Sequence, residues 1–453
     1  YGDILSGDAG DDTIIGANTN DTISGGTGND SLFGEDGNDF IEGGRGSDII
    51  DGGDGNDSIF ADAAGSGRVI EIINHSFEDQ VLGDNSSNST ITGWDEVGGT
   101  QTYNPAASWH LNGGIDGQNI AFLSGTGGPQ SISQTLAETY VAGNTYEFTV
   151  ALGDRVGTAA APFELQVLAG STVIGTLSGF TGTQSTGGLD GLADYTVSTE
   201  GFNDPALNGQ PITIVIIRNT VDSQGQLSVD NVRGVVIEAF DDTVDGGAGN
   251  DTIYGEAGND VLFGEQDDDL LEGGAGDDVL EGGQGDDVLI GGDGNDTLAG
   301  AHRSDNNGQT GNDTLDGGGG DDVFIITNDI GNGQITGGET GETTGDTLDA
   351  QFATAPMTIT LSDLETGTIS DGTSTTSFTE IENLVGSGAS DTLDLNGLAN
   401  PVSVVFSAPG AGTITDSVTG EQITFSSIEQ LILTDGDDTV DATADDGYTD
   451  IQG

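Results

Sequence analysis

A nine-residue period runs through two segments of this chain and limits its fold more than any other feature. An Asp recurs every nine residues, and an apolar side chain follows each Asp by two positions. The series in the first segment is Asp3, Asp12, Asp21, Asp30, Asp39, Asp48 and Asp57. The series in the second segment is Asp242, Asp251, Asp260, Asp269, Asp278, Asp287 and Asp296, and after a loop around His302 it resumes with Asp313 and Asp322. A short fixed period of this kind predicts a solenoid made of stacked, equivalent coils.

Glycines precede the Asp residues of the series, as in the stretch Gly-Gly-Thr-Gly-Asn-Asp-Ser-Leu-Phe at residues 25–33. Glycine permits positive φ angles, so the pattern predicts a tight turn that directs backbone carbonyl groups toward one point. The Asp adds a carboxylate there, and carboxylates with carbonyl oxygens are the ligands that Ca²⁺ prefers. The residues after the Asp predict a very short strand whose apolar side chain faces inward. We therefore expect every Asp of the two series from Asp12 onward to be a calcium ligand.

Two nonapeptides should complete one coil, so the expected ligands form two rows. Asp12, Asp30 and Asp48 should line one edge of the solenoid, and Asp21, Asp39 and Asp57 should line the other. Without metal, each row stacks like charges at the spacing of neighbouring strands, which destabilises a sheet. One apolar residue in nine gives a thin core that does not offset the chain entropy alone. The fold is therefore expected to need several Ca²⁺ ions.

These residues match the G-G-x-G-x-D-x-U-x nonapeptide, and in this respect the chain resembles the RTX (repeat-in-toxin, hemolysin-type calcium-binding) family of secreted proteins. The resemblance implies a parallel β-roll with Ca²⁺ bound at its turns. It also implies type I secretion, and thus a location outside the cell or on the cell surface of a Gram-negative bacterium. Extracellular calcium sites have dissociation constants of roughly 10⁻⁴ to 10⁻³ M, so the chain is expected to stay unfolded in calcium-poor cytosol.

The charge of the chain excludes several classes of partner. Its 78 Asp and Glu residues outnumber 6 basic residues, for a formal net charge of −72. Such a surface repels the phosphates of nucleic acid and the anionic lipids of a membrane. The sequence has no Cys and no apolar run of the roughly 20 residues that span a bilayer, so neither disulfides nor membrane insertion are expected. Because residue 1 lies within a repeat, we expect the chain to be a piece of a larger protein.

The nonapeptide is absent from about Arg68 to Glu238, where strand-like stretches replace it. The clearest stretches are residues 69–73, 131–136, 146–152, 163–168, 172–177 and 212–218. Gly, Asn and Pro separate them at short intervals, which predicts an antiparallel β-sandwich. We expect the flanking residues 69–73 and 235–237 to pair, so that the sandwich projects from one nearly continuous β-roll.

The same segment opens with Asn-His-Ser-Phe-Glu at residues 74–78 and closes with Leu-Ser-Val-Asp-Asn-Val at residues 227–232. In this pairing it resembles the jelly-roll of carbohydrate-binding modules and galactose-binding-like domains. That resemblance implies a structural Ca²⁺ held by Glu78 and Asp230. Sugar binding needs exposed aromatic faces, and the candidates in loop-like surroundings are Trp94, Tyr103 and Trp109. The alternative is that these aromatic side chains pack in the core of the sandwich.

A longer repeat of 47 residues follows the second nonapeptide segment. Residues 378–384 (Phe-Thr-Glu-Ile-Glu-Asn-Leu) align with residues 425–431 (Phe-Ser-Ser-Ile-Glu-Gln-Leu), and residues 390–394 align with residues 437–441. A weaker copy of the second motif lies at residues 345–349. Short runs of Thr, Ile, Val and Leu in a repeat of this length predict several strands per unit of a β-helix or related stack.

Together these patterns predict an all-β chain, with a Ca²⁺-bound parallel β-roll solenoid, an inserted jelly-roll β-sandwich and a C-terminal β-helix-like solenoid. The expected boundaries are residues 1–65 and 239–326 for the two parts of the roll. Residues 66–238 should form the sandwich, which is carbohydrate-binding-module-like, and residues 327–453 the last solenoid.

The sequence contains no H-E-x-x-H, G-x-S-x-G or Walker-type motif, so we do not expect an enzyme. His110, beside Trp109, is the residue to inspect for a ligand or base, and a loop or core histidine is the alternative. Three interpretations of function stay open. The first is a calcium-stabilised structural protein of a surface layer, filament or adhesin that assembles with copies of itself. The second is a glycan-binding adhesin module on an RTX stalk, and the third is the non-catalytic part of a secreted hydrolase, epimerase or toxin.

Overall fold

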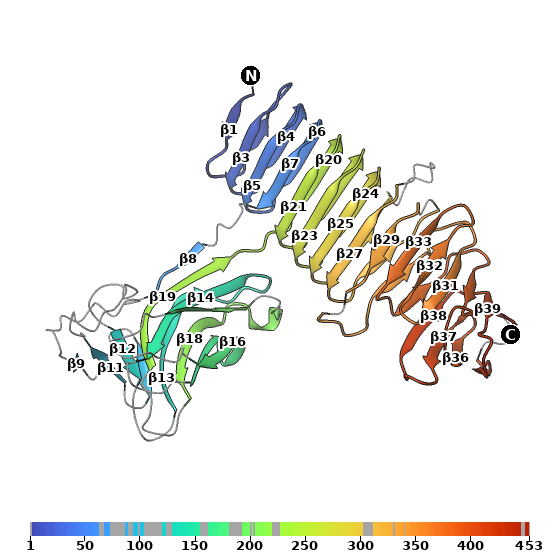
Figure 1. The fold of residues 1–453 in the computed structure, drawn as a ribbon. Helices are drawn as coiled ribbons and strands as arrows, with labels where there is room; N and C mark the ends of the chain where they lie inside the picture. The colour runs from blue at the N-terminus through green and yellow to red at the C-terminus, as the bar shows by residue number, and fades with distance from the viewer. Residues whose placement is uncertain are drawn as a thin grey trace. The chain divides into compact units, whose positions relative to one another are not determined.

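The computed structural model describes residues 2–62, 68–72, 87–88, 94–97, 100–103, 120–123, 129–154, 162–180, 193–199, 202, 204–219, 227–301, 311–328, 331–338, 340–444 and 449–452. These residues divide into two compact units, residues 1–64 with 240–453 and residues 65–239. The first unit is a stack of short strands and the second is a sandwich of longer ones (Figure 1). The all-β prediction is confirmed, with a 3₁₀ turn, η2 (Pro205–Leu207), in the sandwich. Over the described ranges, no helix has the length and apolar character needed to cross a membrane.

Two parallel sheets build the roll, and successive nonapeptides alternate between them. Strand partners are 18 residues apart, as in Thr22↔Phe40, so two nonapeptides complete a coil as predicted. The strands of the first sheet in the roll are β1 (Ile4–Ser6), β3 (Thr22–Thr27), β5 (Phe40–Arg45), β7 (Ser58–Asp62), β21 (Thr252–Ala257), β23 (Leu270–Ala275), β25 (Val288–Asp293), β27 (Thr314–Gly319) and β29 (Gln334–Thr336). Those of the second sheet are β2 (Thr13–Ile15), β4 (Ser31–Asp36), β6 (Ile49–Asp54), β20 (Thr243–Ala248), β22 (Val261–Gln266), β24 (Val279–Gln284), β26 (Thr297–Ala299), β28 (Val323–Ile325) and β30 (Thr347–Asp349).

The core of the roll is the row of apolar side chains between the two sheets. Ile23, Leu32, Leu262 and Leu271, each two residues after an Asp of the series, are fully buried. Burying one such side chain stabilises the fold by about 1.5–3 kcal/mol. Ordering the backbone of nine residues costs roughly 1–2 kcal/mol for each residue. The core therefore does not hold the roll together without a further interaction.

The two nonapeptide segments form one continuous roll. Strand β6 pairs in parallel with β20, and β7 pairs in parallel with β21, in the same register as the other coils (Figure 1). Within the other unit, β8 (Arg68–Ile70) pairs with the end of β19 (Leu227–Ile237), where Val69 lies opposite Val235. Both the continuity of the roll and the pairing of the flanking strands agree with the prediction.

The C-terminal solenoid continues both sheets but adds antiparallel strands that the sequence did not predict. In the first sheet β32 runs antiparallel to both β31 and β33, and in the second sheet β37 runs antiparallel to both β36 and β38. Equivalent strands of successive 47-residue copies thus lie in opposite sheets. The strands are β31 (Thr358–Asp363), β32 (Thr366–Ser370), β33 (Thr375–Thr379), β34 (Asn383–Val385), β35 (Thr392–Asp394), β36 (Val402–Ala408), β37 (Ala411–Asp416), β38 (Gln422–Ser426), β39 (Gln430–Ile432), β40 (Thr439–Asp441) and β41 (Asp450–Gln452).

The second unit consists of a five-stranded and a seven-stranded antiparallel sheet. Five of the six predicted strand stretches lie within strands of these sheets, whereas the stretch at residues 69–73 overlaps β8 only at Val69 and Ile70. The first sheet has the order β10 (Asp95–Val97), β13 (Gln130–Thr139), β18 (Pro211–Arg218), β15 (Pro162–Ala169) and β16 (Thr172–Phe180). The second has the order β17 (Ala193–Ser198), β14 (Thr145–Asp154), β19, β12 (Ile120–Leu123), β11 (Thr100–Tyr103) and β9 (Ser87–Asn88), with β8 paired to β19.

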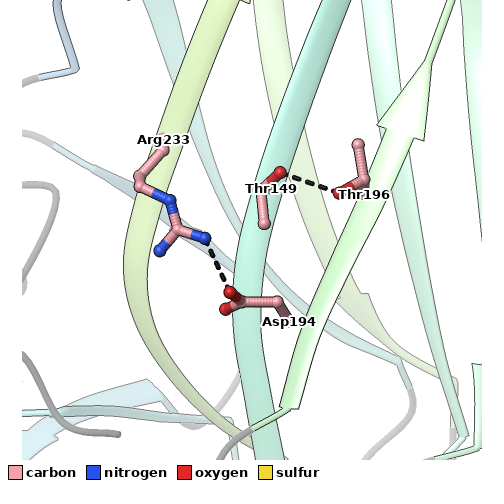
Figure 2. A network of polar contacts seen from close by, with 4 residues as sticks. All are labelled: Thr149, Asp194, Thr196 and Arg233. Atoms are coloured by element: carbon pink, nitrogen blue, oxygen red, sulfur yellow. Dashed lines mark hydrogen bonds and ion pairs between the residues drawn. The ribbon is translucent and has the colours of Figure 1, made fainter.

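Side chains alternate across the seven-stranded sheet, as expected for one buried and one solvated face. Phe148 and Val150 of β14 are fully buried in the sandwich core. Between them, Thr149 shares a 2.8 Å hydrogen bond with Thr196 of β17 on the outward face (Figure 2). On the same face, Arg233 of β19 forms a 2.8 Å ion pair with Asp194 of β17 (Figure 2). Polar cross-strand pairs therefore cover the outer side of this sheet.

Candidate metal centre

The aspartates of the nonapeptides form two ladders of hydrogen bonds along the roll. The backbone N–H of Asp30 donates to Oδ1 of Asp48 at 2.7 Å, and the N–H of Asp39 donates to Oδ1 of Asp57 at 2.7 Å. The same bond joins each Asp to its counterpart in the following coil. The first ladder contains Asp12, Asp30, Asp48, Asp242, Asp260, Asp278, Asp296, Asp322 and Asp346. The second contains Asp3, Asp21, Asp39, Asp57, Asp251, Asp269, Asp287 and Asp313.

The other carboxylate oxygen of these side chains is buried and has no hydrogen-bond partner within the described part of the chain. This holds for Oδ2 of Asp12, Asp21, Asp30, Asp39, Asp48, Asp57, Asp242, Asp251, Asp260, Asp269, Asp278, Asp287, Asp296, Asp322 and Asp346. A buried charge without a partner is strongly destabilising, so buried charges in proteins are paired or coordinate metals. Because the chain has very few basic residues, a cation from solution is the partner that these oxygens require.

Backbone carbonyl oxygens face the same space as the orphaned carboxylate oxygens. A Cβ atom added to Gly255 would lie 2.5 Å from Oδ2 of Asp260 and 2.6 Å from the carbonyl oxygen of Gly273. A Cβ atom added to Gly52 would lie 2.6 Å from Oδ2 of Asp57. The first glycine of the nonapeptide thus leaves room beside carboxylate and carbonyl oxygens that a side chain would fill. Oxygen ligands of these two kinds form the ligand set of Ca²⁺.

The glycines at the second and fourth positions of the nonapeptide shape the turn itself. Gly26 has a φ of 111° and Gly28 a φ of 127°, values that L side chains rarely adopt. In addition, a Cβ atom at either position would overlap a backbone carbonyl of the preceding coil. These glycines therefore permit both the turn and the close stacking that brings the aspartates of successive coils together.

The ladder strongly disfavours ionised carboxylates in the absence of metal. Burial raises the pKa of Asp242 to about 7, that of Asp269 to about 8 and that of Asp260 to about 9. Loss of hydration is the main cause, and neighbouring aspartates of the ladder raise each pKa further, whereas the backbone N–H bond lowers it. A divalent cation between successive coils supplies the missing positive charge and favours the ionised form. The residues of the turns therefore fit Ca²⁺.

The structure brings the predicted nonapeptide ligands together in the two ladders. Asp313 occupies its place in the second ladder, where its Oδ1 accepts a 3.1 Å bond from the N–H of Asp287. Sequence reasoning left Asp346 out of the ligand set, although it is fully buried and continues the first ladder beyond Asp322. The signal was present in the weak Gly-Asp-Thr-Leu-Asp copy at residues 345–349, where the preceding glycines, at positions 337, 338, 341 and 345, do not keep the spacing of the nonapeptide.

The residues predicted to act in the sandwich are described only in part. Trp94 is 6% exposed and belongs to the core cluster, so the alternative of core packing holds for this ring and it presents no free face to a sugar. Tyr103 lies in β11 and Asp230 lies in β19, and their side chains are outside the described set. Glu78, Trp109 and the three histidines, including His110, lie outside the described residues.

Comparisons with known proteins match different families to the two units. The RTX calcium-binding nonapeptide repeat family matches residues 1–32, 33–64, 238–271, 263–298 and 307–325. The HpiC1-like family, described as HpiC1 cyclase, matches residues 68–233. No curated protein matches the chain.

Several solved structures are similar to part of this chain. A Stig cyclase, Fisc from Fischerella sp. TAU, is 21% identical, with 38% of this chain and 100% of that chain covered and a TM-score of 0.32. The carbohydrate-binding module TmCBM61 is 11% identical, with 37% and 98% covered and a TM-score of 0.26. The CBM22-1 xylan-binding domain of Xyn10C from Paenibacillus barcinonensis is 15% identical, with 39% and 99% covered and a TM-score of 0.25.

The RTX resemblance stated from the sequence is confirmed by the family match, and the ladders of buried aspartates supply its chemistry. Residues 1–64, 238–298 and 307–325 are therefore RTX calcium-binding nonapeptide repeats, which bind several Ca²⁺ ions.

Proposed function

We propose that this chain is a calcium-dependent extracellular structural protein, of the surface-layer, filament or adhesin type, that folds and assembles on Ca²⁺ after type I secretion. The observation that carries the proposal is the pair of ladders, whose buried Oδ2 atoms have no donor over the described ranges. A roll with these carboxylates ionised is unstable until cations bind, so its folding follows the calcium concentration. RTX repeats are typical of secreted, extracellular proteins, which matches this behaviour.

The free energies involved fit folding outside the cell. Extracellular sites bind Ca²⁺ with dissociation constants of roughly 10⁻⁴ to 10⁻³ M. A site stabilises the fold by about 2.7 kcal/mol when free Ca²⁺ exceeds its dissociation constant a hundredfold. Summed over many turns, this term exceeds the total stability of an ordinary domain, about 5–15 kcal/mol. In calcium-poor cytosol the same term is close to zero, which keeps the chain unfolded for export.

An aromatic strip on the outer face of the roll supports the assembly step of the proposal. Phe60 of β7 stacks on Tyr254 of β21 with ring centroids 4.9 Å apart, and Phe40 of β5 lies 5.5 Å from Phe60. Each ring alternates along its strand with a core residue, and Phe40 is 44% exposed. Adjacent apolar rings on a flat sheet favour lateral contact with another copy once Ca²⁺ has reduced the charge repulsion.

Circular dichroism and electron microscopy of the same samples test the two halves of the proposal. Added Ca²⁺ should induce β structure in chelated protein, and then ordered polymers, whereas equal Mg²⁺ should do neither. The variant Phe40→Ser should keep calcium-induced folding and lose polymers. Unchanged β structure in excess EDTA would overturn the folding half, and monomers at saturating Ca²⁺ would overturn the assembly half.

The family match of residues 68–233 to HpiC1 cyclase favours a second candidate function for the sandwich. In this candidate, the sandwich binds and cyclises a small organic molecule, and the roll acts as its calcium-dependent stalk. A third candidate function is glycan binding by the same unit, with Tyr103 and Trp109 as the aromatic residues that contact the sugar. A similar cyclase structure holds 4-(1H-indol-3-yl)butan-2-one, and TmCBM61 holds β-1,4-galactotriose, so these two compounds are suitable probes. Saturation-transfer NMR of the full chain with each probe separates the candidates, because each candidate predicts a signal from its own probe. Absence of signal from both probes would reject both candidates.

A further inference from the structure

In two copies, the 47-residue repeat places a hydroxyl group four residues before an aspartate, which is fully buried in the case of Asp391 and partly buried in the case of Asp438. In one copy, Oγ of Ser387 donates toward both carboxylate oxygens of Asp391, at 2.8 and 2.9 Å. In the next copy, Oγ1 of Thr434 does the same for Asp438, at 2.7 and 2.9 Å. The hydroxyl thus supplies a donor at the position where the nonapeptide turns leave Oδ2 without one. The C-terminal solenoid satisfies these aspartates with its own side chains.

The first copy of the motif departs from this pattern. Its aspartate is Asp346, and the residue four positions earlier is Glu342, whose ionised carboxylate accepts hydrogen bonds but donates none. Asp346 is fully buried, and its Oδ1 accepts a 2.7 Å bond from the N–H of Asp322. Its Oδ2 has no hydrogen-bond partner among the described residues. A carboxylate therefore stands where the other two copies place a donor to the aspartate.

A third carboxylate lies at the same place. Oε2 of Glu382 accepts a 2.7 Å bond from the N–H of Asp346, just as Oε2 of Glu429 accepts one from the N–H of Asp391 at 2.9 Å. One carboxylate oxygen from each of Glu342, Asp346 and Glu382 lies within 4.8 Å of the other two. Oxygen ligands held 2.3–2.6 Å from a Ca²⁺ ion are at most about 5 Å apart, so the three oxygens fit around one ion.

The backbone completes the arrangement. A Cβ atom added to Gly337 would overlap both Oδ2 of Asp346 and the carbonyl oxygen of Glu380, so this glycine keeps open a space lined by two oxygens. Asp321 fixes the loop that carries Glu342. Its carboxylate accepts hydrogen bonds from the N–H groups of Thr343, Thr344 and Gly345 at 2.8, 2.9 and 2.9 Å. The oxygens are thus positioned by the fold.

We propose that Glu342, Asp346 and Glu382, with the carbonyl oxygen of Glu380, bind a Ca²⁺ ion outside the nonapeptide series. The ligand set contains only oxygen and carries three negative charges, which suits a hard divalent cation and no thiophilic metal. The site joins the last coil of the roll, through Asp322 and Asp346, to the first turn of the C-terminal solenoid. It marks the boundary between aspartates satisfied by metal and aspartates satisfied by hydroxyl groups.

Calcium anomalous scattering from crystals of the full chain tests this site directly. A peak is expected among the carboxylates of Glu342, Asp346 and Glu382, in addition to the peaks at the nonapeptide turns. The variant Glu342→Ser restores the hydroxyl found in the other copies, so it should lose this peak while the roll keeps its own. The variant Ser387→Ala is the matched control and should leave every peak in place.

The converse substitution supplies an independent measurement. Ser387→Glu places a third carboxylate beside Asp391 and Glu429, and a new peak is expected there. In solution, hydrogen exchange of residues 386–394 should become calcium-dependent in Ser387→Glu and stay calcium-independent in Ser387→Ala. Nonapeptide peaks without density beside Asp346 in the parent crystals would overturn the proposal. A peak that persists unchanged in Glu342→Ser would equally reject Glu342 as a ligand.

Discussion

The backbone N–H of Asp57 donates to Oδ1 of Asp251 at 2.6 Å, although 194 residues separate the two in the chain. The equivalent bond between Asp39 and Asp57 spans 18 residues and measures 2.7 Å. The insertion therefore leaves the geometry of the ladder intact. The insertion adds 176 residues, the difference between the two spacings, which is not a multiple of nine, so the pairing of the strands on either side maintains the register.

This continuity predicts that the sandwich can be deleted if the phase is kept. Removing residues 64–239 restores the nine-residue spacing between Asp57 and Asp242, so the variant should fold on Ca²⁺ with the same midpoint as the parent. Circular dichroism against calcium concentration measures that midpoint. A deletion that also removes residues 240–243 is the matched control, because it takes Asp242 out of the ladder and leaves the turn too short to reach the next strand. Equal behaviour of the two deletions would contradict the prediction.

Asp269→Asn should change stability with opposite signs in the presence and absence of calcium. With Ca²⁺, loss of a charged ligand should weaken binding at its turn by up to about 2.7 kcal/mol, the contribution of one well-occupied site. In chelator, the neutral amide avoids both a buried charge and the protonation that the raised pKa of Asp269 imposes beside Asp251 and Asp287, so the metal-free fold should become more stable. Urea denaturation under both conditions gives the two values. The exposed neighbour Asp268 provides the control variant Asp268→Asn, for which both changes should be small.

The metal-free roll should gain structure as the pH falls. The pKa is raised to about 7 for Asp242 and about 9 for Asp260, whereas an unfolded Asp titrates near about 3.9. Between these values the folded state binds more protons than the unfolded state, so stability is lost as pH rises from about 4 to about 9. Circular dichroism in EDTA across this range should show β content increasing toward pH 4. A decrease on acidification would disprove the sign.

Calcium affinity should decrease as the pH falls, whereas the stability of the metal-free roll should increase. The reason is that protons and Ca²⁺ compete for the same carboxylates. Isothermal titration calorimetry between pH 8 and pH 5 should show weaker binding at the lower pH, with proton release on binding. Affinity that does not depend on pH would mean that the ladder aspartates are ionised before the metal arrives.

Gly255→Ala should block a turn through steric overlap, since the φ angle of this residue is not in the region that favours glycine. The added Cβ atom would lie 2.5 Å from Oδ2 of Asp260 and 2.6 Å from the carbonyl oxygen of Gly273, within the space assigned to the cation. The expected result is a higher calcium midpoint and a less cooperative transition. Gly388→Ala is the control, since an added Cβ atom there meets nothing within 4 Å. Equal midpoints for the two variants would show that the cavity beside Gly255 is not the binding site.

Ser387→Ala should destabilise the protein by a similar amount with and without calcium. The substitution removes the hydroxyl that donates to buried Asp391, and an unsatisfied buried acceptor costs about 1–3 kcal/mol. Hydrogen exchange of strands β31 to β39, in Ca²⁺ and in EDTA, measures the change locally. Ser362→Ala, at an exposed serine in β31, should have little effect. A loss that appears only in Ca²⁺ would mean that metal also binds at Asp391.

The sequence predicted the roll well because one local rule governs each coil. The spacing of Asp30, Asp39 and Asp48 determines the ladders, and the apolar residue two positions later determines the core, independently of distant parts of the chain. The strands of the sandwich could be predicted equally well, because β13, β14, β15 and β18 alternate buried side chains with half-buried or exposed ones along most of their length.

The features that escaped prediction depend on long-range contacts. Short runs of Thr and Ile are the same in parallel and antiparallel strands, so the antiparallel β31 and β32 had no distinct signal. Glu382, which accepts a hydrogen bond from the N–H of Asp346, lies 36 residues away in the chain. Its position depends on the length of the antiparallel strands β31 to β33 that lie between the two residues. Trp94 occurs in a loop-like stretch and is buried only because the sandwich core encloses it.

The buried ladder also has a direction. Every backbone N–H in it points to a side chain of the coil that comes later in the sequence, and the final N–H, that of Asp346, points to Glu382 in the C-terminal solenoid. The Oδ1 acceptors of a coil therefore lie on its successor, while other backbone bonds, such as that from the N–H of Ser31 to the carbonyl oxygen of Asp12, lead back to the preceding coil. Because the N–H of Asp346 finds its acceptor beyond the roll, the C-terminal solenoid provides the cap that an array of repeats needs at its end.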